Sequence, residues 1–231
     1  MLFDLGGTLV DDRDFGGFAD LARRVQLEIE PDTLAHAFLE VERAFDVGPP
    51  PGDREARILA FWRETLSHAA ERPVPEEVVR RFRALDAGSR RPYPVYSDVR
   101  RCLDALHRQG RRLGVVSNAT SEAEVRRILD TAGILDRFAR VTASGSESVS
   151  KPNPAIFLRT VERLGVTPAE ALHVGNLEHA DARAARAAGL HALWLNRFGT
   201  GLGLDPPEIT SLLEVAPWIH RVEHGEEPPQ P

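Results

Sequence analysis

Short apolar runs alternate with amphipathic stretches over residues 1–10 and 93–198. Three of the runs are bounded by glycine, serine or asparagine, as strands buried in a parallel sheet are: 113–117, 172–175 and 192–195. The amphipathic stretches have apolar residues at helical spacing, and each is followed by a glycine in the position of a helix C-cap: 98–109, 121–132, 154–164 and 181–188. This alternation with short loops predicts an α/β fold with a doubly wound, Rossmann-like parallel sheet.

Residues 14–91 interrupt the alternation. They contain several stretches with helical spacing, separated by proline-rich breaks, and no convincing strand. We therefore predict an all-helical insertion at 14–91 within an α/β core that comprises residues 1–13 and 92–222. The acidic, proline-rich stretch 223–231 is predicted to be a disordered tail.

Composition narrows the class of protein without changing the predicted fold. The chain has 231 residues, of which 42% are apolar and 28% charged, and its formal net charge is −6. This is a globular composition, and it offers no basic surface that would point to nucleic acid or an anionic membrane as a partner. No apolar run approaches the roughly 18 residues of a membrane helix, and no signal-peptide pattern opens the sequence. The single cysteine, Cys102, excludes a disulfide framework and indicates a cytoplasmic location.

Polar residues stand where the predicted strands end, which is the edge at which open α/β sheets form their active sites. Asp4 ends the first apolar run, Ser117 and Asn118 end the next, and Asp181 follows a third. Lys151 precedes a predicted helix and is the only lysine among 29 basic residues. Arginine would serve solubility equally well, so a compact ammonium group at this position indicates a specific role.

Each of these residues also has a structural explanation when it is taken alone. Asp4 can be a solvated acid, Ser117 and Asn118 a turn or helix cap, and Asp181 a capping residue at a helix start. His173 lies in a predicted buried strand and is expected to be a core histidine with satisfied hydrogen bonds. The joint pattern is far less expected by chance than any one of its parts.

The joint pattern resembles the haloacid dehalogenase (HAD) superfamily of aspartate-nucleophile hydrolases, in particular members with a helical cap inserted after the first motif. Residues 4–9, with the sequence DLGGTL, are similar to motif one, usually D-x-D-G-T-L. Residues 115–118 (VVSN), 151–157 (KPNPAIF) and 174–181 (VGNLEHAD) are similar to motifs two, three and four, the last usually G-D-x4-D. The resemblance covers nearly the whole chain and implies that the helical insertion is the cap.

The resemblance implies a division of roles among the motif residues. Asp4 would attack the electrophile and form a covalent aspartyl intermediate, which water then hydrolyses. Ser117 and Lys151 would bind oxygens of the transferring group, and Lys151 would also offset the charge of Asp4. Thr8 and Asn118 would support the loops that carry these groups.

The resemblance also implies Mg²⁺ as a cofactor. The ion would bind Asp4, the main-chain carbonyl of Gly6 and Asn176, with Asp181 contributing directly or through water. Asn176 stands where the family usually has an aspartate, so the site keeps an oxygen ligand but loses one negative charge. We therefore expect metal binding that is weakened rather than absent.

Gly6 is a second departure from the family pattern. It replaces the aspartate that usually acts as general acid and base, and glycine can neither protonate a leaving oxygen nor activate water. Groups of this kind accelerate reactions roughly 10²–10⁴-fold, so turnover of ordinary alkyl phosphates should fall by about that factor. Asp11 and Asp12 follow closely, but no sequence signal places either of them at the site.

Three functions stay open, and we favour the first. It is a phosphatase-type hydrolase that acts on a small phosphorylated metabolite with a good leaving group, or one that recruits an acid from the cap. The second is a 2-haloacid dehalogenase, a branch that lacks the second motif-one aspartate and needs no Mg²⁺, although Phe157 stands where that branch typically has tyrosine. The third is a catalytically degenerate protein that binds a phosphate ligand or another protein. We expect a monomer or a homodimer, because cap helices can pair subunits.

Overall fold

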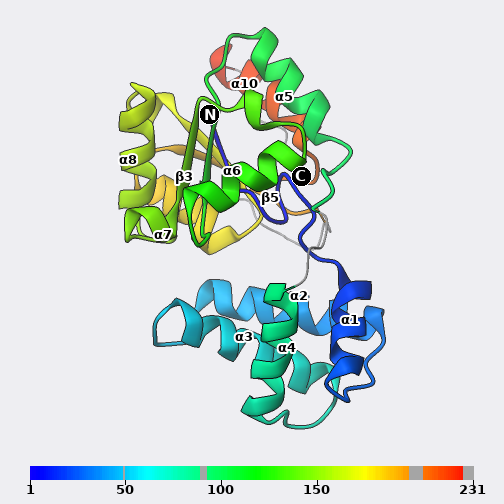
Figure 1. The fold of residues 1–231 in the computed structure, drawn as a ribbon. Helices are drawn as coiled ribbons and strands as arrows, with labels where there is room; N and C mark the ends of the chain where they lie inside the picture. Colours follow the sequence, from blue (N-terminus) through cyan, green and yellow to red (C-terminus); the bar gives the residue numbers. More distant parts are fainter. Residues whose placement is uncertain (49, 89–92, 198–204, 226–231) are drawn as a thin grey trace. The chain divides into compact units, whose positions relative to one another are not determined.

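The computed structural model describes residues 1–48, 50–88, 93–197 and 205–225. The chain divides into two compact units: Met1–Asp12 together with Tyr93–Pro231 form the first, and Arg13–Pro92 form the second. The first is an α/β unit, and the described residues of the second form helices and loops without a strand (Figure 1).

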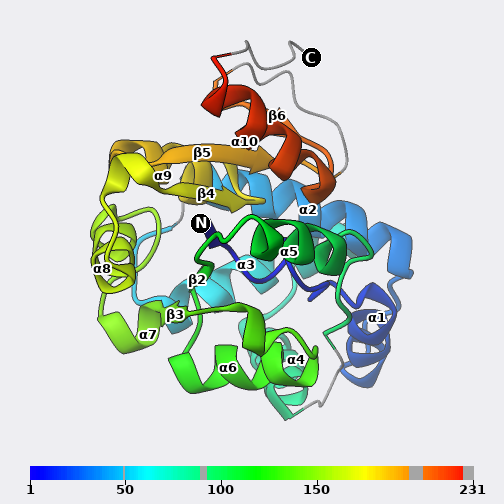
Figure 2. The same ribbon diagram turned by 90° about the horizontal axis from the view of Figure 1, so that it is seen from above.

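The α/β unit is built on a six-stranded parallel sheet with the strand order β3-β2-β1-β4-β5-β6. The strands are β1 Leu2–Phe3, β2 Gly114–Ser117, β3 Arg140–Ala143, β4 Leu172–Gly175, β5 His191–Leu195 and β6 Glu208–Ile209. The chain adds strands outward from β1 as far as β3, and then returns to the other side of β1 and continues from β4 (Figure 2). The predicted α/β fold with a doubly wound, Rossmann-like sheet is confirmed.

The direction in which strands are added reverses between β1 and β4. β1 pairs with a strand on each side, so that Phe3 is in register with Val115 of β2 and Val174 of β4. In open α/β sheets, ligands bind at the carboxyl ends of the strands that flank such a reversal. The fold therefore places its expected binding crevice directly after β1 and β4.

Helices cover both faces of this sheet. Successive side chains of a strand point to opposite faces, so apolar neighbours in one strand need a covering helix on each side. Phe3 belongs to one apolar cluster and Leu2, its neighbour in β1, to another. The helices that share the cluster of Phe3 are α5 Val99–Arg108, α6 Glu122–Thr131 and α10 Val215–Glu223. Those that share the cluster of Leu2 are α8 Ala155–Leu164 and α9 Ala184–Ala187. Shorter helical turns complete the unit: η1 Leu135–Arg137, α7 Ser144–Glu147, η2 Pro168–Glu170, η3 Glu178–Arg183 and η4 Leu212–Glu214.

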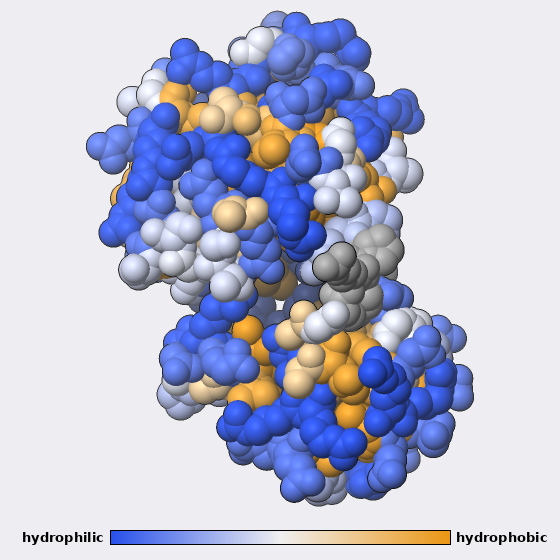
Figure 3. Space-filling model, in the orientation of Figure 1, coloured by the Kyte–Doolittle hydropathy of each residue, from blue (hydrophilic) through white to orange (hydrophobic). Residues whose placement is uncertain are grey.

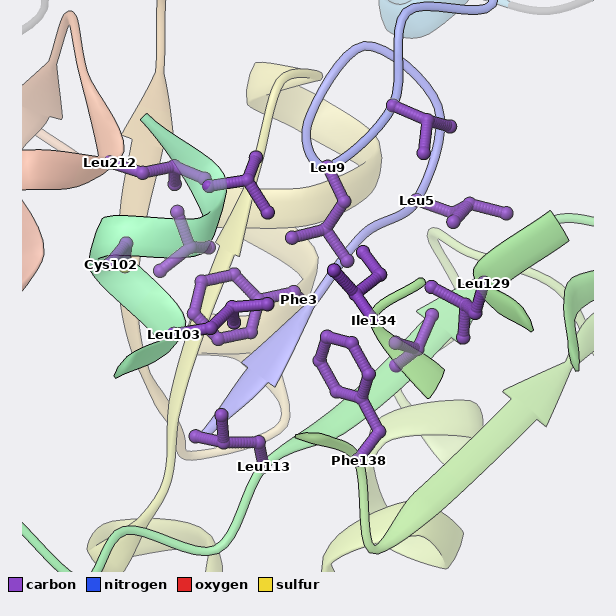
Figure 4. Close-up of a cluster of buried hydrophobic side chains, with 14 of the residues drawn as sticks. Phe3, Leu5, Leu9, Cys102, Leu103, Leu113, Leu129, Ile134, Phe138 and Leu212 are labelled. Carbon is purple, nitrogen blue, oxygen red and sulfur yellow. The ribbon is translucent and has the colours of Figure 1, made fainter. Parts of the chain in front are cut away.

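Figure 4 shows the first of these clusters at close range, with Phe3 among side chains from β2, α5 and the segment after α6. The rings of Phe3 and Phe138 meet edge to face with centroids 6.4 Å apart. Leu5 and Leu9, which belong to the first motif, are also buried in this cluster. The loop after β1 is thus anchored in the core by its own apolar residues.

The structure contains elements that the apolar pattern did not predict, namely β3, β6 and α10. Arg140 and Thr142 break the apolar run expected of a buried strand, which hides β3 from a reading of the pattern. The predicted disordered tail begins too early, because Glu223 ends α10 and its carboxylate accepts two hydrogen bonds from Arg111, at 2.6 and 2.8 Å. The rest of that predicted tail, 226–231, lies outside the described residues.

The second unit is a bundle of helices with a core of its own. Its helices are α1 Phe15–Arg24, α2 Pro31–Val47, α3 Arg54–Ala69 and α4 Glu76–Gly88. Asp14 and Asp53 cap α1 and α3 by accepting hydrogen bonds from main-chain N–H groups of the first turn. Trp62 lies at the centre, with its ring centroid 4.7 Å from that of Phe18 and 4.8 Å from that of Phe82.

Hydrophilic residues predominate on the face shown in Figure 3, with apolar patches between them. The large apolar side chains that are exposed among the described residues are Val47, Leu158, Leu213 and Val222. Across the part of the chain that the structure describes, no helix combines the length and the apolar character needed to cross a membrane.

Candidate active site

The first motif forms a tight loop directly after β1. The carbonyl of Leu5 accepts hydrogen bonds from the N–H groups of Leu9 (2.8 Å) and Val10 (3.1 Å), and Gly7 donates to the carbonyl of Val10 at 2.9 Å. Gly7 has a φ of +70°, a conformation that glycine adopts without strain. Gly6 forms a short bridge with Val10. The loop therefore turns the chain back at once beside the end of β1.

Asp4 and Lys151 meet at the carboxyl edge of the sheet. The main-chain N–H of Asp4 donates to the carbonyl of Val174 at 2.9 Å, which fixes this residue between β1 and β4. Lys151 Nζ donates to Asp4 Oδ1 at 2.5 Å and to Asp181 Oδ1 at 2.5 Å. All three side chains are buried, with exposed fractions of 10% for Asp4, 2% for Lys151 and 0% for Asp181. The structure thus joins motifs one, three and four through the only lysine of the chain.

The electrostatics of this trio follow from burial and mutual charge. Burial raises the pKa of Asp4, and the attraction of Lys151 does not fully offset that effect. Burial alone would lower the pKa of Lys151, but the carboxylates of Asp181 and Asp4 outweigh it and hold the ammonium group charged. Burial would likewise raise the pKa of Asp181, yet Lys151 and His173 keep it well below the ordinary range. At neutral pH the site therefore holds a lysine cation beside the firmly ionised Asp181.

Asn118 supports Lys151 through its main chain. Its side-chain amide donates from Nδ2 to the carbonyl of Lys151 at 3.0 Å, and its Oδ1 accepts from the N–H of Lys151 at 2.9 Å. Both main-chain hydrogen-bonding groups of Lys151 are thus held by a single side chain. Ser117 ends β2 beside Asn118 and is 7% exposed. Asn118 positions Lys151, while Ser117 lies at the strand edge expected for a substrate contact.

The fourth motif requires its glycine because Asp181 approaches the main chain very closely. A Cβ on Gly175 would lie 2.3 Å from Cγ of Asp181, closer than any side chain allows. Asp181 belongs to η3, a π-helical turn, and its Oδ2 accepts a hydrogen bond from the N–H of Leu177 at 3.1 Å. Its Oδ1 faces both Lys151 Nζ and, at 3.0 Å, Nε2 of His173. Both carboxylate oxygens of the buried Asp181 therefore have hydrogen-bond partners. The structural explanation offered by the sequence, a capping residue at a helix start, does not account for the contacts with Lys151 and His173.

His173 differs from its expected role in one respect. It is buried in β4, as predicted, and its Nε2 is partnered by Asp181. Its Nδ1 is buried with no hydrogen-bond partner among the described residues. The prediction of a satisfied core histidine is thus correct for one ring nitrogen and wrong for the other.

Thr8 and Asn176 connect motif one to motif four. Thr8 is fully buried, and its hydroxyl donates to Oδ1 of Asn176 over a long 3.4 Å. The main-chain carbonyl of Asn176 accepts from Nε1 of Trp194 at 3.0 Å, which ties it to β5. The amide oxygen of Asn176 thus faces the loop that carries Asp4 and Gly6.

Arg197 is a site residue that the sequence analysis missed. Its guanidinium donates to the carbonyl of Thr8 at 2.7 Å and to that of Gly7 at 3.3 Å. It also pairs with Asp98 at 2.9 Å and lies over the ring of Tyr96, 4.0 Å from the centroid. Asp98 is 99 positions away in the chain, so no local pattern announces the pair. The sequence signals that remain are an arginine two residues after a core strand and, far from it in the chain, an acid at a helix start.

The oxygen donors present suit a hard cation better than any other ion. Among the described residues, no group of three or more histidine, cysteine or acidic side chains is placed to hold a metal ion. The donors that the family resemblance implies are the carboxylate of Asp4, the main-chain carbonyl of Gly6 and the amide oxygen of Asn176, which faces Thr8. Mg²⁺ is commonly held by one or two carboxylates together with water and substrate phosphate, so this small donor set fits it.

Comparison with known sequences decides the family. The sequence model of the haloacid dehalogenase-like hydrolases matches residues 1–189, well over half of the chain. The chain belongs to this family. Open α/β sheets bind their ligands at the carboxyl ends of the strands, which is where Asp4, Lys151 and Asp181 meet in this structure.

Several curated relatives of this HAD-like chain are phosphatases. It is 34% identical over 200 residues to a phosphoglycolate phosphatase of Xylella fastidiosa, a match that covers 84% of this chain and 80% of the relative. It is 32% identical over 154 residues to a phosphoserine phosphatase of Thermus thermophilus, where the match covers 67% of this chain and 59% of the relative's length.

Solved structures of HAD-like proteins share the fold over nearly the whole chain. A HAD phosphatase from Thermococcus onnurineus is 27% identical with a TM-score of 0.59, and the match covers 97% of both chains. A 2-haloacid dehalogenase from Pseudomonas syringae is 26% identical with a TM-score of 0.61, covering 96% of this chain and 97% of the other. Both chemistries that the sequence left open thus occur on this fold, and both sequence relatives quoted above are phosphatases.

Proposed function

We propose that this HAD-like hydrolase is a phosphatase that transfers the phosphoryl group of a small phosphorylated metabolite first to Asp4 and then to water. The observation that carries the proposal is the buried contact of Lys151 with both Asp4 and Asp181 at the reversal point of the sheet. A buried cation beside a nucleophilic carboxylate lowers the repulsion between that carboxylate and an incoming phosphate dianion.

The roles of the other residues follow from their positions. An oxygen of Asp4 attacks phosphorus as the bond to the leaving oxygen breaks, and an aspartyl phosphate forms. Lys151 and the Ser117 hydroxyl bind phosphoryl oxygens, and Asn118 holds Lys151 in place. Arg197 and Thr8 fix the loop that carries the nucleophile.

Mg²⁺ is the cofactor that we propose for this site. Asp4, the carbonyl of Gly6 and Asn176 would hold it, and when bound it would neutralise charge between the nucleophile and the phosphate. Asp181 is assigned a different role from the one the family resemblance suggested. Both of its oxygens are already engaged, by Lys151, His173 and Leu177, so it orients Lys151 instead of binding the ion.

Substrate and setting complete the proposal. The phosphatases among its relatives support a small phosphorylated metabolite as substrate. The single cysteine supports a cytoplasmic enzyme, and the net charge of −6 supports one without nucleic acid or membrane as partner. We expect it to act as a monomer or homodimer.

The second candidate is a 2-haloacid dehalogenase. It is favoured by the structural match to the Pseudomonas syringae enzyme and by Gly6, because a halide leaves without being protonated. In that reaction Asp4 would attack carbon, and Lys151 would keep its role beside the nucleophile.

Hydrolysis of p-nitrophenyl phosphate and acetyl phosphate, with and without Mg²⁺, tests the proposal in wild type against Asp4→Asn. We expect Mg²⁺-dependent turnover in the wild type and none in the variant, with unchanged circular dichroism. Halide release from 2-chloropropionate without phosphatase activity would establish the dehalogenase instead. Inactivity toward all three compounds would favour a protein that binds a phosphate ligand without chemistry.

A further inference from the structure

The space beside Gly6 is filled by a carboxylate from elsewhere in the chain. A Cβ built on Gly6 would lie 2.2 Å from Oδ2 of Asp12, 2.9 Å from its Cγ and 3.3 Å from its Oδ1. In an aspartate side chain the carboxylate oxygens lie about 2.4 Å from their own Cβ, given ordinary bond lengths. Asp12 therefore brings a carboxylate oxygen about as close to this point as an aspartate at position 6 would bring its own.

The path of the chain explains how a residue six positions later reaches Gly6. Val10 bridges back to Gly6 and pairs on its other side with Val95, and the N–H of Asp11 donates to the carbonyl of Pro94 at 2.8 Å. These main-chain contacts fix the strand-like segment that leads into Asp12. The loop thus returns over its own beginning, and a side chain at position 12 can cover position 6.

The identity of residue 6 follows from the same contact. Any side chain there would have to displace the carboxylate of Asp12, since even a Cβ comes within 2.2 Å of it. Gly6 has a φ outside the left-handed region, so no backbone requirement of its own calls for glycine. The position of the Asp12 carboxylate therefore requires that residue 6 have no side chain.

From this geometry we infer that Asp12 is the general acid and base of the proposed phosphatase, in place of the aspartate that Gly6 removes. In the first step the bond between phosphorus and the leaving oxygen breaks as Asp4 attacks, and the leaving oxygen takes the proton of the Asp12 carboxyl. In the second step the Asp12 carboxylate takes a proton from water, the water oxygen bonds to phosphorus, and the bond to Asp4 breaks. Asp12 is an exposed residue, as a group that exchanges protons with a substrate and with water must be.

This inference rests on the proposed function, and Asp12→Asn tests it with Asp11→Asn as the matched control. The two variants remove the same charge from adjacent positions. We expect Asp12→Asn to lower the turnover of an alkyl phosphate such as phosphoglycolate by about 10²–10⁴-fold, while Asp11→Asn stays near wild type. Equal thermal unfolding midpoints of the two variants would show that the loss is not one of folding.

A good leaving group separates the two steps. With p-nitrophenyl phosphate, Asp12→Asn should release about one p-nitrophenolate per enzyme in a rapid burst, because this group leaves without protonation. Slow turnover should follow, and a phosphorylated enzyme should accumulate and be visible by intact-protein mass spectrometry, because no base activates the water. A residue that only shaped the loop would slow the burst as well.

Moving the carboxylate supplies the reciprocal test. Asp12→Ala removes the carboxylate and opens the space beside position 6. The double variant Gly6→Asp/Asp12→Ala restores a carboxylate there, now carried by residue 6. We expect the double variant to recover at least about ten-fold of the activity lost in Asp12→Ala, and Gly6→Asp alone to gain little, since the two carboxylates would compete for one space.

Two outcomes overturn different statements. In the first, wild type hydrolyses phosphates through Asp4, but Asp12→Asn keeps full activity on phosphoglycolate and shows no burst with p-nitrophenyl phosphate. The role of Asp12 is then wrong and the proposed function stands. If wild type hydrolyses no phosphate, or Asp4→Asn stays active, the proposed function fails and the role of Asp12 fails with it.

Discussion

Lys151 is a lysine buried between two carboxylates, and the size and shape of its charged group matter as much as its charge. Lys151 Nζ lies 2.5 Å from an oxygen of Asp4 and 2.5 Å from one of Asp181, and its side chain is 2% exposed. The ammonium group is small enough to contact both oxygens at once, whereas the planar guanidinium of arginine spreads its charge over a rigid fork. This explains why position 151 is a lysine in a chain whose other basic residues are arginines.

Lys151→Arg should therefore be damaging although it conserves charge. We expect turnover of p-nitrophenyl phosphate to fall by about 10²-fold or more, in the range seen when one electrostatic contact of an active site is lost. The control is the reverse substitution, Arg126→Lys, at an ion pair with Glu122 on the surface. We expect it to leave turnover unchanged. Wild-type activity in Lys151→Arg would show that the compactness of the ammonium group is unimportant.

Asn176 is one of the ligands that we propose for Mg²⁺, and it differs from an aspartate by one charge. Asn176→Asp adds a negative charge to an otherwise unchanged oxygen donor that faces Thr8. We expect the Mg²⁺ concentration for half-maximal activity to fall about 10-fold, a change of about 1.4 kcal/mol in binding free energy. A Mg²⁺ titration of activity in both proteins measures this, and an unchanged midpoint would remove Asn176 from the ligand set.

The elements of the core are tied together at Asp98, which precedes α5. Its carboxylate accepts hydrogen bonds from Arg197, from the Ser211 hydroxyl at 3.0 Å and from the N–H of Leu212 at 2.9 Å. Burial would raise the pKa of Asp98, but these donors outweigh it and lower the pKa. Through Arg197 the same carboxylate holds the motif-one loop.

This lowered pKa makes part of the stability depend on pH in a definite direction. Asp98 contributes stability above the ordinary carboxyl pKa of about 4, and the contribution is lost as pH falls through the lowered pKa of the folded state. Asp98→Asn should cost roughly 3 kcal/mol of unfolding free energy at pH 7, as removal of one partner of a buried ion pair does. The difference from wild type should shrink below about pH 4 in urea unfolding, and a difference independent of pH would contradict the assignment.

The sequence predicts elements well where pattern and local chemistry agree. The runs at 113–117, 172–175 and 192–195 correspond to strands β2, β4 and β5 within about one residue. β3 was missed because its burial comes from the sheet around it and not from an apolar sequence. The helical insertion was visible because it lacks strand patterns altogether.

The candidate site was predictable in its residues but not in its contacts. Lys151 could be singled out from its rarity, and Asp4 from its place after a strand. The pairing of Arg197 with Asp98 and the reach of Asp12 toward Gly6 depend on how loops turn in three dimensions, which no local pattern encodes. Motif residues can be predicted from short stretches of sequence, whereas the residues that complete the site can be found only from the path of the chain in three dimensions.

At the scale of the whole molecule, the buried Cys102 reports on the integrity of the α/β unit. Burial in the cluster of Phe3 raises the pKa of its thiol to about 12. A thiol with this pKa and an exposed fraction of 2% should react with a thiol reagent only after the unit opens. We expect negligible labelling of native protein in an hour and complete labelling in 6 M guanidinium chloride, and rapid stoichiometric labelling without denaturant would contradict the packing described.

The central position of β1 has a consequence for synthesis on the ribosome. Asp4 is made before its partners, because Lys151 follows 147 positions later and Asp181 another 30 after that. β1 itself has only two residues and pairs with β2 and β4, so it cannot be fixed in the sheet until both have emerged. A nascent chain stalled before residue 151 would thus carry Asp4 without its countercharge, and activity should appear only once β4 and Asp181 have emerged as well.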